Sequence, residues 1–113
     1  VSSVKIFMLD LDALRIKFPR IVIKKAKFPA MTIKCTKLKI GSSIVISMFR
    51  TGKIILTGAK TETEAPIVLS QIIKRYLLHG RTIWTPEQYN KFEKEEQNAI
   101  EEHGDELIAP FLV

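Results

Sequence analysis

The residue types that most often carry acid–base, nucleophilic or metal chemistry are few in this sequence and form no catalytic pattern. His79 and His103 stand at the expected C-terminal ends of helices, where the helix dipole favours a cation, and neither has a metal-ligand spacing to Cys35. Asp10 and Asp12 are two residues apart, so they do not share a helix face, and Asp10 is better placed as a helix cap. The sequence therefore predicts no enzyme, no metal site and no cofactor.

A row of apolar and basic residues on two neighbouring strands has a clearer chemical meaning. Side chains alternate across a strand, so Phe49 should lie opposite Ile46 and Met48, and Lys53 should share a face with Ile55 on the next strand. One face must form the core, so the other is expected to expose Phe and Ile among lysines. Exposed apolar patches usually mark contact surfaces. Apolar wedges flanked by cations are the means by which minor-groove proteins kink DNA.

The charge of the 113-residue chain is divided unevenly. Residues 1–85 contain 16 Lys and Arg against 4 Asp and Glu, whereas residues 86–113 contain 2 Lys against 8 Asp and Glu. A basic body with an acidic appendage indicates a domain that binds a polyanion. The alternative is that the lysines form only a solvated face. One hypothesis for the appendage is that it mimics DNA and covers the basic sheet.

The bulk composition indicates a globular domain without a membrane span. Apolar residues make up 46% of the chain and charged residues 27%. No apolar run approaches the roughly 20 residues that cross a bilayer. The single cysteine, Cys35, is expected to be a small buried residue and fits a reducing intracellular compartment.

Four segments rich in β-formers are predicted to be strands, and a short helix should follow the first of them. The strands are residues 1–9, 27–35, 44–49 and 53–57. Asp10 should cap the helix at 11–18, and Pro29 marks the second strand as an edge or a bulge. Residues 36–43 should form a long hairpin tip.

Two further helices are expected toward the C-terminus. The first begins at Thr63 and stops at Gly80. The second is capped by Thr85, which forms a capping box with Gln88, and should run to His103. This order predicts an α+β fold, a curved antiparallel sheet with helices on its convex face. The domain should span residues 1–84, and residues 85–113 should be an acidic C-terminal helix and tail.

Three stretches of this sequence resemble motifs of the TATA-box-binding protein family. Residues 49–60, Phe-Arg-Thr-Gly-Lys-Ile-Ile-Leu-Thr-Gly-Ala-Lys, resemble that family's run of Phe, Gly-Lys and Thr-Gly-Ala-Lys. Residues 27–30, Lys-Phe-Pro-Ala, resemble its Phe-Pro-Gly, and residues 9–11, Leu-Asp-Leu, resemble the opening of its first short helix. The resemblance covers residues 3–81 and one repeat of the family's two-repeat saddle.

The resemblance implies a half-saddle that serves as a DNA-binding domain of a transcription initiation factor. Its concave sheet would bind and bend the minor groove of AT-rich duplex DNA. Carried over position by position, seven residues would contact that DNA. They are the intercalating pair Phe28 and Phe49, Ile55 and Thr57 against base and sugar edges, and Lys27, Lys34 and Lys53 at phosphates.

The same resemblance implies partners and a location. A complete saddle would need a homodimer or a second repeat in a longer chain. Other initiation factors or the RNA polymerase machinery would be protein partners. The chain would act in the nucleus, or in a viral factory or virion if its source is a large DNA virus.

The sequence also departs from the family pattern. The family's first strand carries an asparagine that reads the central base pairs, but this chain has no Asn before Asn90. Ser47 stands where the family has a groove-facing leucine. The hairpin after the second strand is longer and carries Lys37 and Lys39. The acidic helix at 86–103 has no counterpart in the usual repeat.

Two other functions fit the same residues. One is an accessory domain of an enzyme, because the substrate-binding domain of type III ribonuclease H looks like the same repeat and would bind RNA–DNA hybrids. The other is a protein-interaction or dimerisation module that uses the apolar sheet face. Nucleic-acid binding should weaken steeply with salt, whereas a protein interface should not.

Overall fold

The computed structural model describes residues 2–24, 30–35 and 44–112, without the side chains of Ser2 and of residues 103–112. Within these ranges the chain forms a sheet, three α-helices and a 3₁₀ helix. In chain order they are β1 (Ser2–Lys5), α1 (Leu11–Lys17), β2 (Val22–Lys24), β3 (Ala30–Lys34), β4 (Val45–Phe49), β5 (Lys53–Thr57), α2 (Glu64–Arg75), η2 (Leu77–Gly80) and α3 (Pro86–Leu112).

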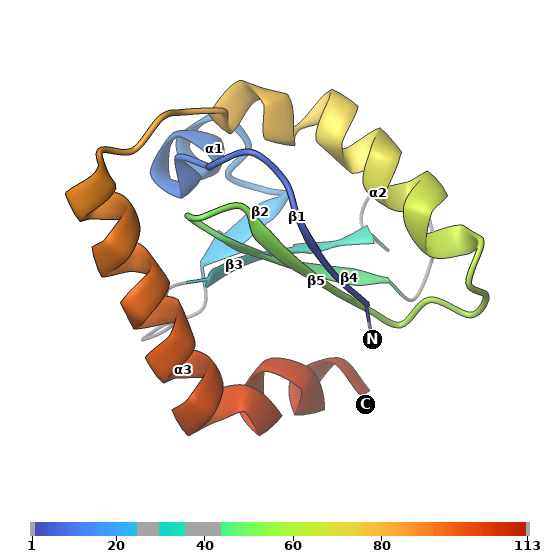
Figure 1. Ribbon diagram of the computed structural model, residues 1–113. Coiled ribbons are helices and arrows are strands. Elements are labelled where there is room, and N and C mark those ends of the chain that lie inside the picture. The colour runs from blue at the N-terminus through green and yellow to red at the C-terminus, as the bar shows by residue number, and fades with distance from the viewer. Residues whose placement is uncertain (1, 25–29, 36–43, 113) are drawn as a thin grey trace.

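The sheet is antiparallel throughout and has the strand order β1-β5-β4-β3-β2 (Figure 1). β3, β4 and β5 form a meander, and β1 reaches across from the start of the chain to pair with β5. Ser47 pairs with Thr32 on one side and with Ile55 on the other, which fixes the register of the meander. Because paired residues share a sheet face, this register determines which side chains face the helices.

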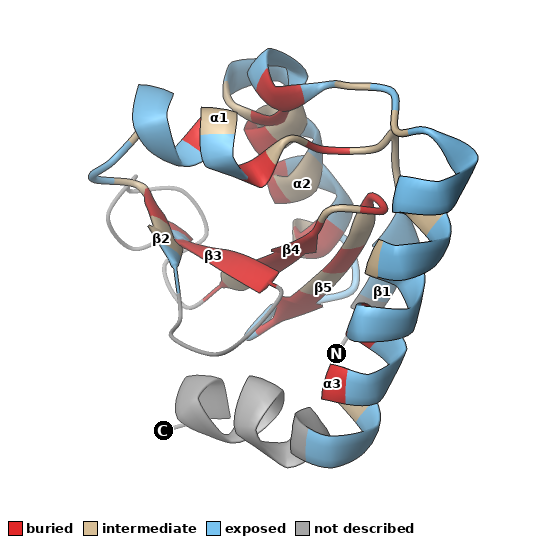
Figure 2. Cartoon of the chain, turned by 90° about the vertical axis from the view of Figure 1, so that its left-hand side faces the viewer, coloured by how far each residue is buried: buried red, intermediate tan, exposed pale blue. Residues whose placement is uncertain are grey.

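One face of the sheet packs against α1, α2 and η2 and forms the main core. Apolar residues alternate along the strands to supply it, and all of those on the meander are almost fully buried (Figure 2). They are Met31 and Ile33 of β3, Ile46 and Met48 of β4, and Ile54 and Leu56 of β5. Leu14 of α1, Ile72 of α2 and Leu77 of η2 complete the core from above.

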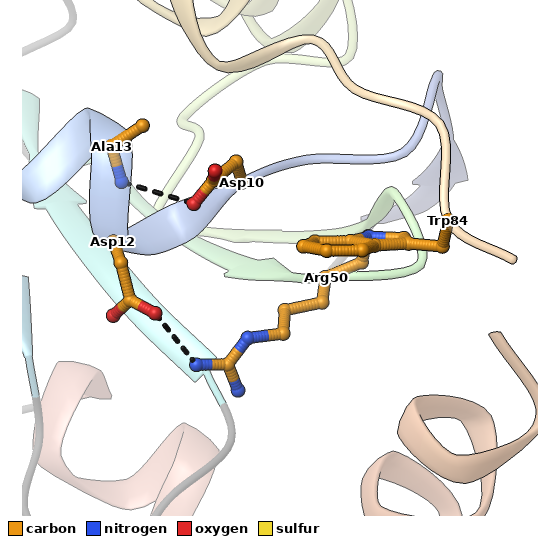
Figure 3. Close-up of polar contacts among 5 residues, drawn as sticks. All are labelled: Asp10, Asp12, Ala13, Arg50 and Trp84. Atoms are coloured by element: carbon orange, nitrogen blue, oxygen red, sulfur yellow. Dashed lines mark hydrogen bonds and ion pairs between the residues drawn. The ribbon is translucent and has the colours of Figure 1, made fainter. Parts of the chain in front are cut away.

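The helix starts follow the capping chemistry expected from the sequence. Asp10 accepts a hydrogen bond from the Ala13 backbone N–H at 3.0 Å, as Figure 3 shows. Thr85 and Gln88 form the predicted capping box, with reciprocal bonds of 3.1 and 3.2 Å. Thr63 occupies the N-cap position of α2 without a side-chain cap bond, and Pro66 at the third helical position has no N–H to donate. The Glu64 N–H donates to the Thr61 hydroxyl.

The predicted α+β fold is confirmed, with corrections to several elements. β1 ends at Lys5 and not at residue 9, and α2 ends at Arg75, after which η2 reaches Gly80. Residues 22–24 form β2, an edge strand that was not predicted, and buried Val22 anchors it. α3 does not stop at Gly104 but continues to Leu112. A glycine inside a helix costs only about 1 kcal/mol relative to alanine, so the helix-forming residues around it carry the helix through. The expected hairpin tip at 36–43 and Pro29 lie outside the described residues.

α3 runs apart from α2, alongside the sheet. In both views its described turns descend beside the end of the sheet where β4 turns into β5 (Figures 1 and 2). Residues 81–85 connect it to the body. This connection is fastened by a bond from the Thr82 N–H to the Met8 carbonyl and by another from Trp84 Nε1 to the Arg50 carbonyl.

Candidate nucleic-acid interface

The sheet face turned away from α1 and α2, called the distal face below, carries most of the residues that the sequence singled out. The strand register gathers them into cross-strand pairs: Lys5 with Lys53, Ser47 with Ile55, and Val45 with both Lys34 and Thr57. Small polar and apolar residues thus occupy the middle of the face, and lysines stand at its ends. The residues of the distal face are Ser3, Lys5, Ala30, Thr32, Lys34, Val45, Ser47, Phe49, Lys53, Ile55 and Thr57.

The predicted contact residues that can be placed share this face but differ in exposure. Lys34 is exposed, Lys53 and Ile55 are half-buried, and Thr57 is buried. The Thr57 hydroxyl has no hydrogen-bond partner among the described residues. Phe28 and Lys27, the other two predicted contacts, lie outside the described residues.

Phe49 corrects one expectation from the sequence. It was expected on an exposed row, but its side chain is 0% exposed. It packs in a small second cluster with Ala30 and Ala99, and Ile55 and Ile100 border that cluster. The aromatic ring lies on the predicted face, but α3 covers it. The reason is physical: a large apolar ring left in water is costly, and the chain's own helix removes it from water.

A buried carboxylate joins α3 to the tip of the β4–β5 hairpin. Glu96 is 5% exposed, and its Oε1 accepts hydrogen bonds from the Thr51 N–H at 3.0 Å and from the Thr51 hydroxyl at 2.7 Å. Burial raises the pKa of Glu96, while the bonds from Thr51 and the charges of Lys53 and Lys5 oppose that rise. The carboxylate therefore lies on the basic side of the sheet with partial compensation for its desolvation.

The hairpin tip that holds Glu96 depends on a glycine. Gly52 has φ +92°, and its N–H closes a turn to the Phe49 carbonyl at 3.0 Å. A Cβ at this position would lie 2.5 Å from the Phe7 carbonyl oxygen and 2.6 Å from that of Ile6. The Gly-Lys pair of the sequence motif therefore has a structural reason. The glycine allows the tip to contact the chain after β1 and presents Lys53 on the distal face.

Lys5 makes the second polar contact with α3. Its ammonium donates to the Tyr89 hydroxyl and also lies 4.9 Å from the centre of the Tyr89 ring. The hydrogen bond with Tyr89 raises the pKa of Lys5, and the negative charges of Glu93 and Glu96 act in the same direction, while burial opposes them. Lys5 of β1 therefore lies against an acidic stretch of α3.

Arg50 and Trp84 pack against Phe92, near the start of α3. The Arg50 guanidinium lies 5.2 Å from the centre of the Phe92 ring, and Trp84 packs edge-on against the same ring at 5.0 Å. Figure 3 shows Trp84 beside Arg50, whose side chain reaches Asp12 for an ion pair of 3.4 Å. Asp12 is largely exposed, so this ion pair is expected to contribute little.

A polar cleft of about 370 Å³ lies between α3 and the β1–β5 side of the sheet. Two lysines, Lys5 and Lys53, face two glutamates, Glu93 and Glu96, across it. Its charges balance, and among the described residues no group of three His, Cys, Asp or Glu could hold a metal ion. In the described part of the chain, no helix is long and apolar enough to cross a membrane.

Sequence reasoning missed Lys5, Thr51 and Glu96, which make the polar contacts between the body and α3. The apolar residues of α3 form a stripe at helical spacing: Ala99 is buried, and Tyr89, Phe92 and Ile100 are half-buried. Glu96 lies on this stripe, seven residues after Tyr89 and three before Ala99, so its spacing was the available signal. A glutamate on an otherwise apolar stripe usually indicates a partner, here Thr51.

Cys35 behaves as the sequence indicated. It is 0% exposed, and burial raises the pKa of its thiol to about 11. A thiol with this pKa is mostly protonated at neutral pH and unreactive. Cys35 is a core residue beside Ile33 and Ile44 and not part of the interface.

The described repeat has one helix-covered sheet face and one Lys-flanked face with an aromatic residue, which is the architecture of half of a DNA-binding saddle. The family described as "Transcription factor TFIID (or TATA-binding protein, TBP)" matches residues 1–76, and the chain belongs to this family. The fold is accordingly the expected half-saddle. This is a family of transcription factors, not of enzymes.

One relative illustrates the distance within the family. The TATA-box-binding protein of Pyrobaculum calidifontis is 32% identical over 75 residues, which cover 66% of this chain and 36% of that protein. The chain thus spans little more than a third of the length of the relative that it matches. The family match ends before α3, so the helix that covers the distal face lies outside the matched residues.

Proposed function

We propose that this chain binds double-stranded DNA with its distal face, as a domain of a transcription initiation factor. One observation carries the proposal. The strand register places Phe49, Ile55, Thr57, Lys34 and Lys53 on one sheet face, in a chain that belongs to a family of DNA-binding transcription factors. Lysines at the ends of that face suit phosphates, and small or apolar residues between them suit the floor of a groove.

The minor groove of an AT-rich duplex is the expected target. The Thr57 hydroxyl has no partner among the described residues and, once this buried side chain is uncovered, would donate to an acceptor at the groove floor, where A·T pairs offer only acceptors. Phe49 would enter a base step as a wedge together with Phe28, which kinks the duplex. Lys27, Lys34 and Lys53 would hold the phosphates on both sides of the kink.

A bending assay with donor and acceptor dyes on the two ends of a short AT-rich duplex tests the wedge. Phe28→Ala combined with Phe49→Ala should reduce both the affinity and the bend angle. Phe7→Ala is a control on the other side of the sheet, where Phe7 packs against the main core. If the double variant keeps the wild-type affinity and bend angle, the wedge role is wrong.

The phosphate role of Lys53 has a separate test. Lys53→Gln should weaken binding similarly for all duplex sequences and reduce the slope of log affinity against log salt by about one. Lys74→Gln removes the same charge from an exposed position on α2, on the opposite side of the sheet, and should leave the slope nearly unchanged. Equal slopes for the two variants would exclude a phosphate contact at Lys53.

A second half of the saddle would come from another copy or from a second repeat. β1 pairs only with β5 among the described residues, so its other edge can accept a strand. Beside this edge lies a largely apolar hollow of about 170 Å³, lined by Val4, Leu56, Glu62, Ala65, Pro66 and Leu69. Sedimentation of the chain with and without DNA would show whether two copies assemble. Other initiation factors or RNA polymerase would then meet the assembled saddle.

With the proposed function, the chain would act where its DNA template is located. In a nucleated cell this is the nucleus, and for a viral source it is the viral factory or virion. A competition between duplex DNA and an RNA–DNA hybrid separates this function from a hybrid-binding accessory role. Tighter binding of the hybrid would favour the accessory role.

A further inference from the structure

We propose that α3 is a built-in competitor of DNA, which occupies the distal face until DNA displaces it. This inference rests on the DNA-binding function proposed above and adds its regulation. The helix contacts the same face that is proposed to contact DNA, and the two cannot occupy it together. The chain would therefore have a closed state, with α3 on the sheet, and an open state, with the face free.

The apolar contacts of α3 cover the wedge residue. Phe49 is 0% exposed and packs against Ala99, and Ile100 lies beside the same cluster. A ring in this position cannot enter a base step. Removal of α3 would expose the ring, and intercalation would bury it again. The Phe49 ring is thus removed from water both in the closed state and in the DNA-bound state.

The acidic groups of α3 lie where phosphates would otherwise approach. Glu96 accepts two bonds from Thr51, beside Lys53 on the same hairpin. Glu93 and Glu96 both act on Lys5, whose cross-strand partner is Lys53. A carboxylate near two lysines resembles the contact that a phosphate would make there. Between Pro86 and Glu102 the helix has six Glu and two Lys, so it is acidic along its described length.

The connection to the body allows α3 to leave without unfolding the domain. The bonds of Thr82 and Trp84 tether the chain as far as Trp84, and the capping box at Thr85 lets α3 remain a helix from Pro86 onward. Among the residues whose side chains are described, α3 contributes none to the main core, and it contributes Ala99 and Ile100 to the second cluster. Near the start of the helix, Phe92 also contacts Trp84 and Arg50. Contacts that lie outside the main core are typical of an element that opens separately.

The sharpest test is a substitution whose added charge would by itself weaken DNA binding. Ala99→Glu places a bulky charge against Phe49 and should force α3 off the face, while it adds a negative charge that would by itself weaken DNA binding. Asn98→Glu adds the same charge at an exposed neighbouring position. With a labelled AT-rich duplex, Ala99→Glu should bind at least about tenfold tighter than wild type, since affinity scales with the open fraction. Asn98→Glu should bind the same or more weakly.

A second pair of variants reverses a charge on the helix. Glu96→Lys removes the bond acceptor of Thr51 and places a cation beside Lys5 and Lys53, whereas Glu95→Lys makes the same charge change at an exposed position. Any general gain from two added positive charges is common to both. Glu96→Lys should therefore tighten binding more than Glu95→Lys. Circular dichroism and a thermal melt of each variant verify that the main core is intact.

Hydrogen exchange provides a direct readout of displacement. Addition of the duplex to the wild-type chain should speed the exchange of α3 amides and slow that of β4 and β5. If Ala99→Glu and Asn98→Glu bind equally and α3 exchange does not respond to DNA, α3 is no competitor, while the DNA-binding function stands. If no variant binds duplex at all, the DNA-binding function itself is wrong, and this inference is wrong with it.

Discussion

Ile54 and Ile55 are neighbours on β5, yet they belong to two different environments. Ile54 is 0% exposed in a cluster of apolar residues that joins the sheet to α1, α2 and η2. Ile55 is half-buried on the distal face, where it pairs with Ser47 and borders the cluster around Phe49. Lys53 of the same strand lines the cleft that contains both lysines and glutamates. The core face is closed by many apolar contacts of one kind. Among the residues whose side chains are described, the distal face is closed by contacts of mixed chemistry, polar and apolar, which a polyanion could replace.

Truncation of the two isoleucines measures this difference directly. Ile54→Ala should lower the free energy of unfolding by about 2–5 kcal/mol, because it leaves a cavity in a packed core. Ile55→Ala should cost clearly less, since its surroundings are open to solvent on one side. Urea denaturation followed by circular dichroism would give both values. Equal losses would mean that the distal face is as much a core as the other.

The tip of the β4–β5 hairpin belongs to both environments, because it contacts the chain after β1 and also holds α3. Gly52→Ala should cost about 1–3 kcal/mol from the positive φ alone, and the Cβ clash with the Phe7 and Ile6 carbonyls adds to this. Gly58→Ala is the matched control, because Gly58 has φ +87° at an exposed position. The difference between the two variants in urea denaturation isolates the clash. No difference would show that the tip can shift to make room.

Loss of the Thr51 hydroxyl should loosen α3 while the core remains intact. Thr51→Val keeps the shape but removes one donor to the buried Glu96 carboxylate, which should cost α3 docking about 1.5–3 kcal/mol. The Thr51 N–H still donates. Trp84, the single tryptophan of the chain, packs against Phe92 of α3, so its fluorescence reports docking. An unchanged emission spectrum and unchanged α3 exchange would contradict this assignment.

The smallest expected effect is a dependence of α3 docking on pH. Burial raises the pKa of Glu96 in the docked state, so docking is favoured below the ordinary pKa of a glutamate and weakens as the pH rises through the raised value. Lys5, Lys53 and Glu93 face the same cleft and set the remaining charge. A fluorescence titration of Trp84 should show this transition, and Glu96→Gln should abolish it. A transition that persists in Glu96→Gln belongs to another group.

Much of the fold could be predicted from residue patterns. Alternation predicted the strands of the meander, Asp10 as a cap predicted α1, and a helical period predicted α2. The motif around Gly52 indicated the family. β2 was missed because three residues are too few to show a period. The end of α3 was misplaced because Gly104 is a weak stop signal when helix-forming residues surround it.

The interface was predictable only in part, for a different reason. Alternation within each strand correctly placed Phe49 opposite Met48 and grouped Ile55 with Lys53, because alternation is a property of a single strand. That Phe49 and Ile55 share a face depends on the register between the two strands, in which Ser47 pairs with Ile55. What covers that face depends on a helix more than thirty residues later in the chain, and no local pattern links the two. The uneven division of charge suggested that the acidic helix covers the basic sheet, but only the Thr51–Glu96 and Phe49–Ala99 contacts specify where α3 lies.

The pairing of β1 with β5 has a consequence for how the chain folds during synthesis. β1 leaves the ribosome before the other strands of this sheet, yet its partner, Lys53–Thr57, is made only after α1, β2, β3 and β4. Until then β1 has no strand to pair with, and closing this long loop comes late and slowly. A nascent chain that ends after β4 would hold β1 unpaired and open to chaperones. Emergence of β5 is the step that commits the domain to its sheet.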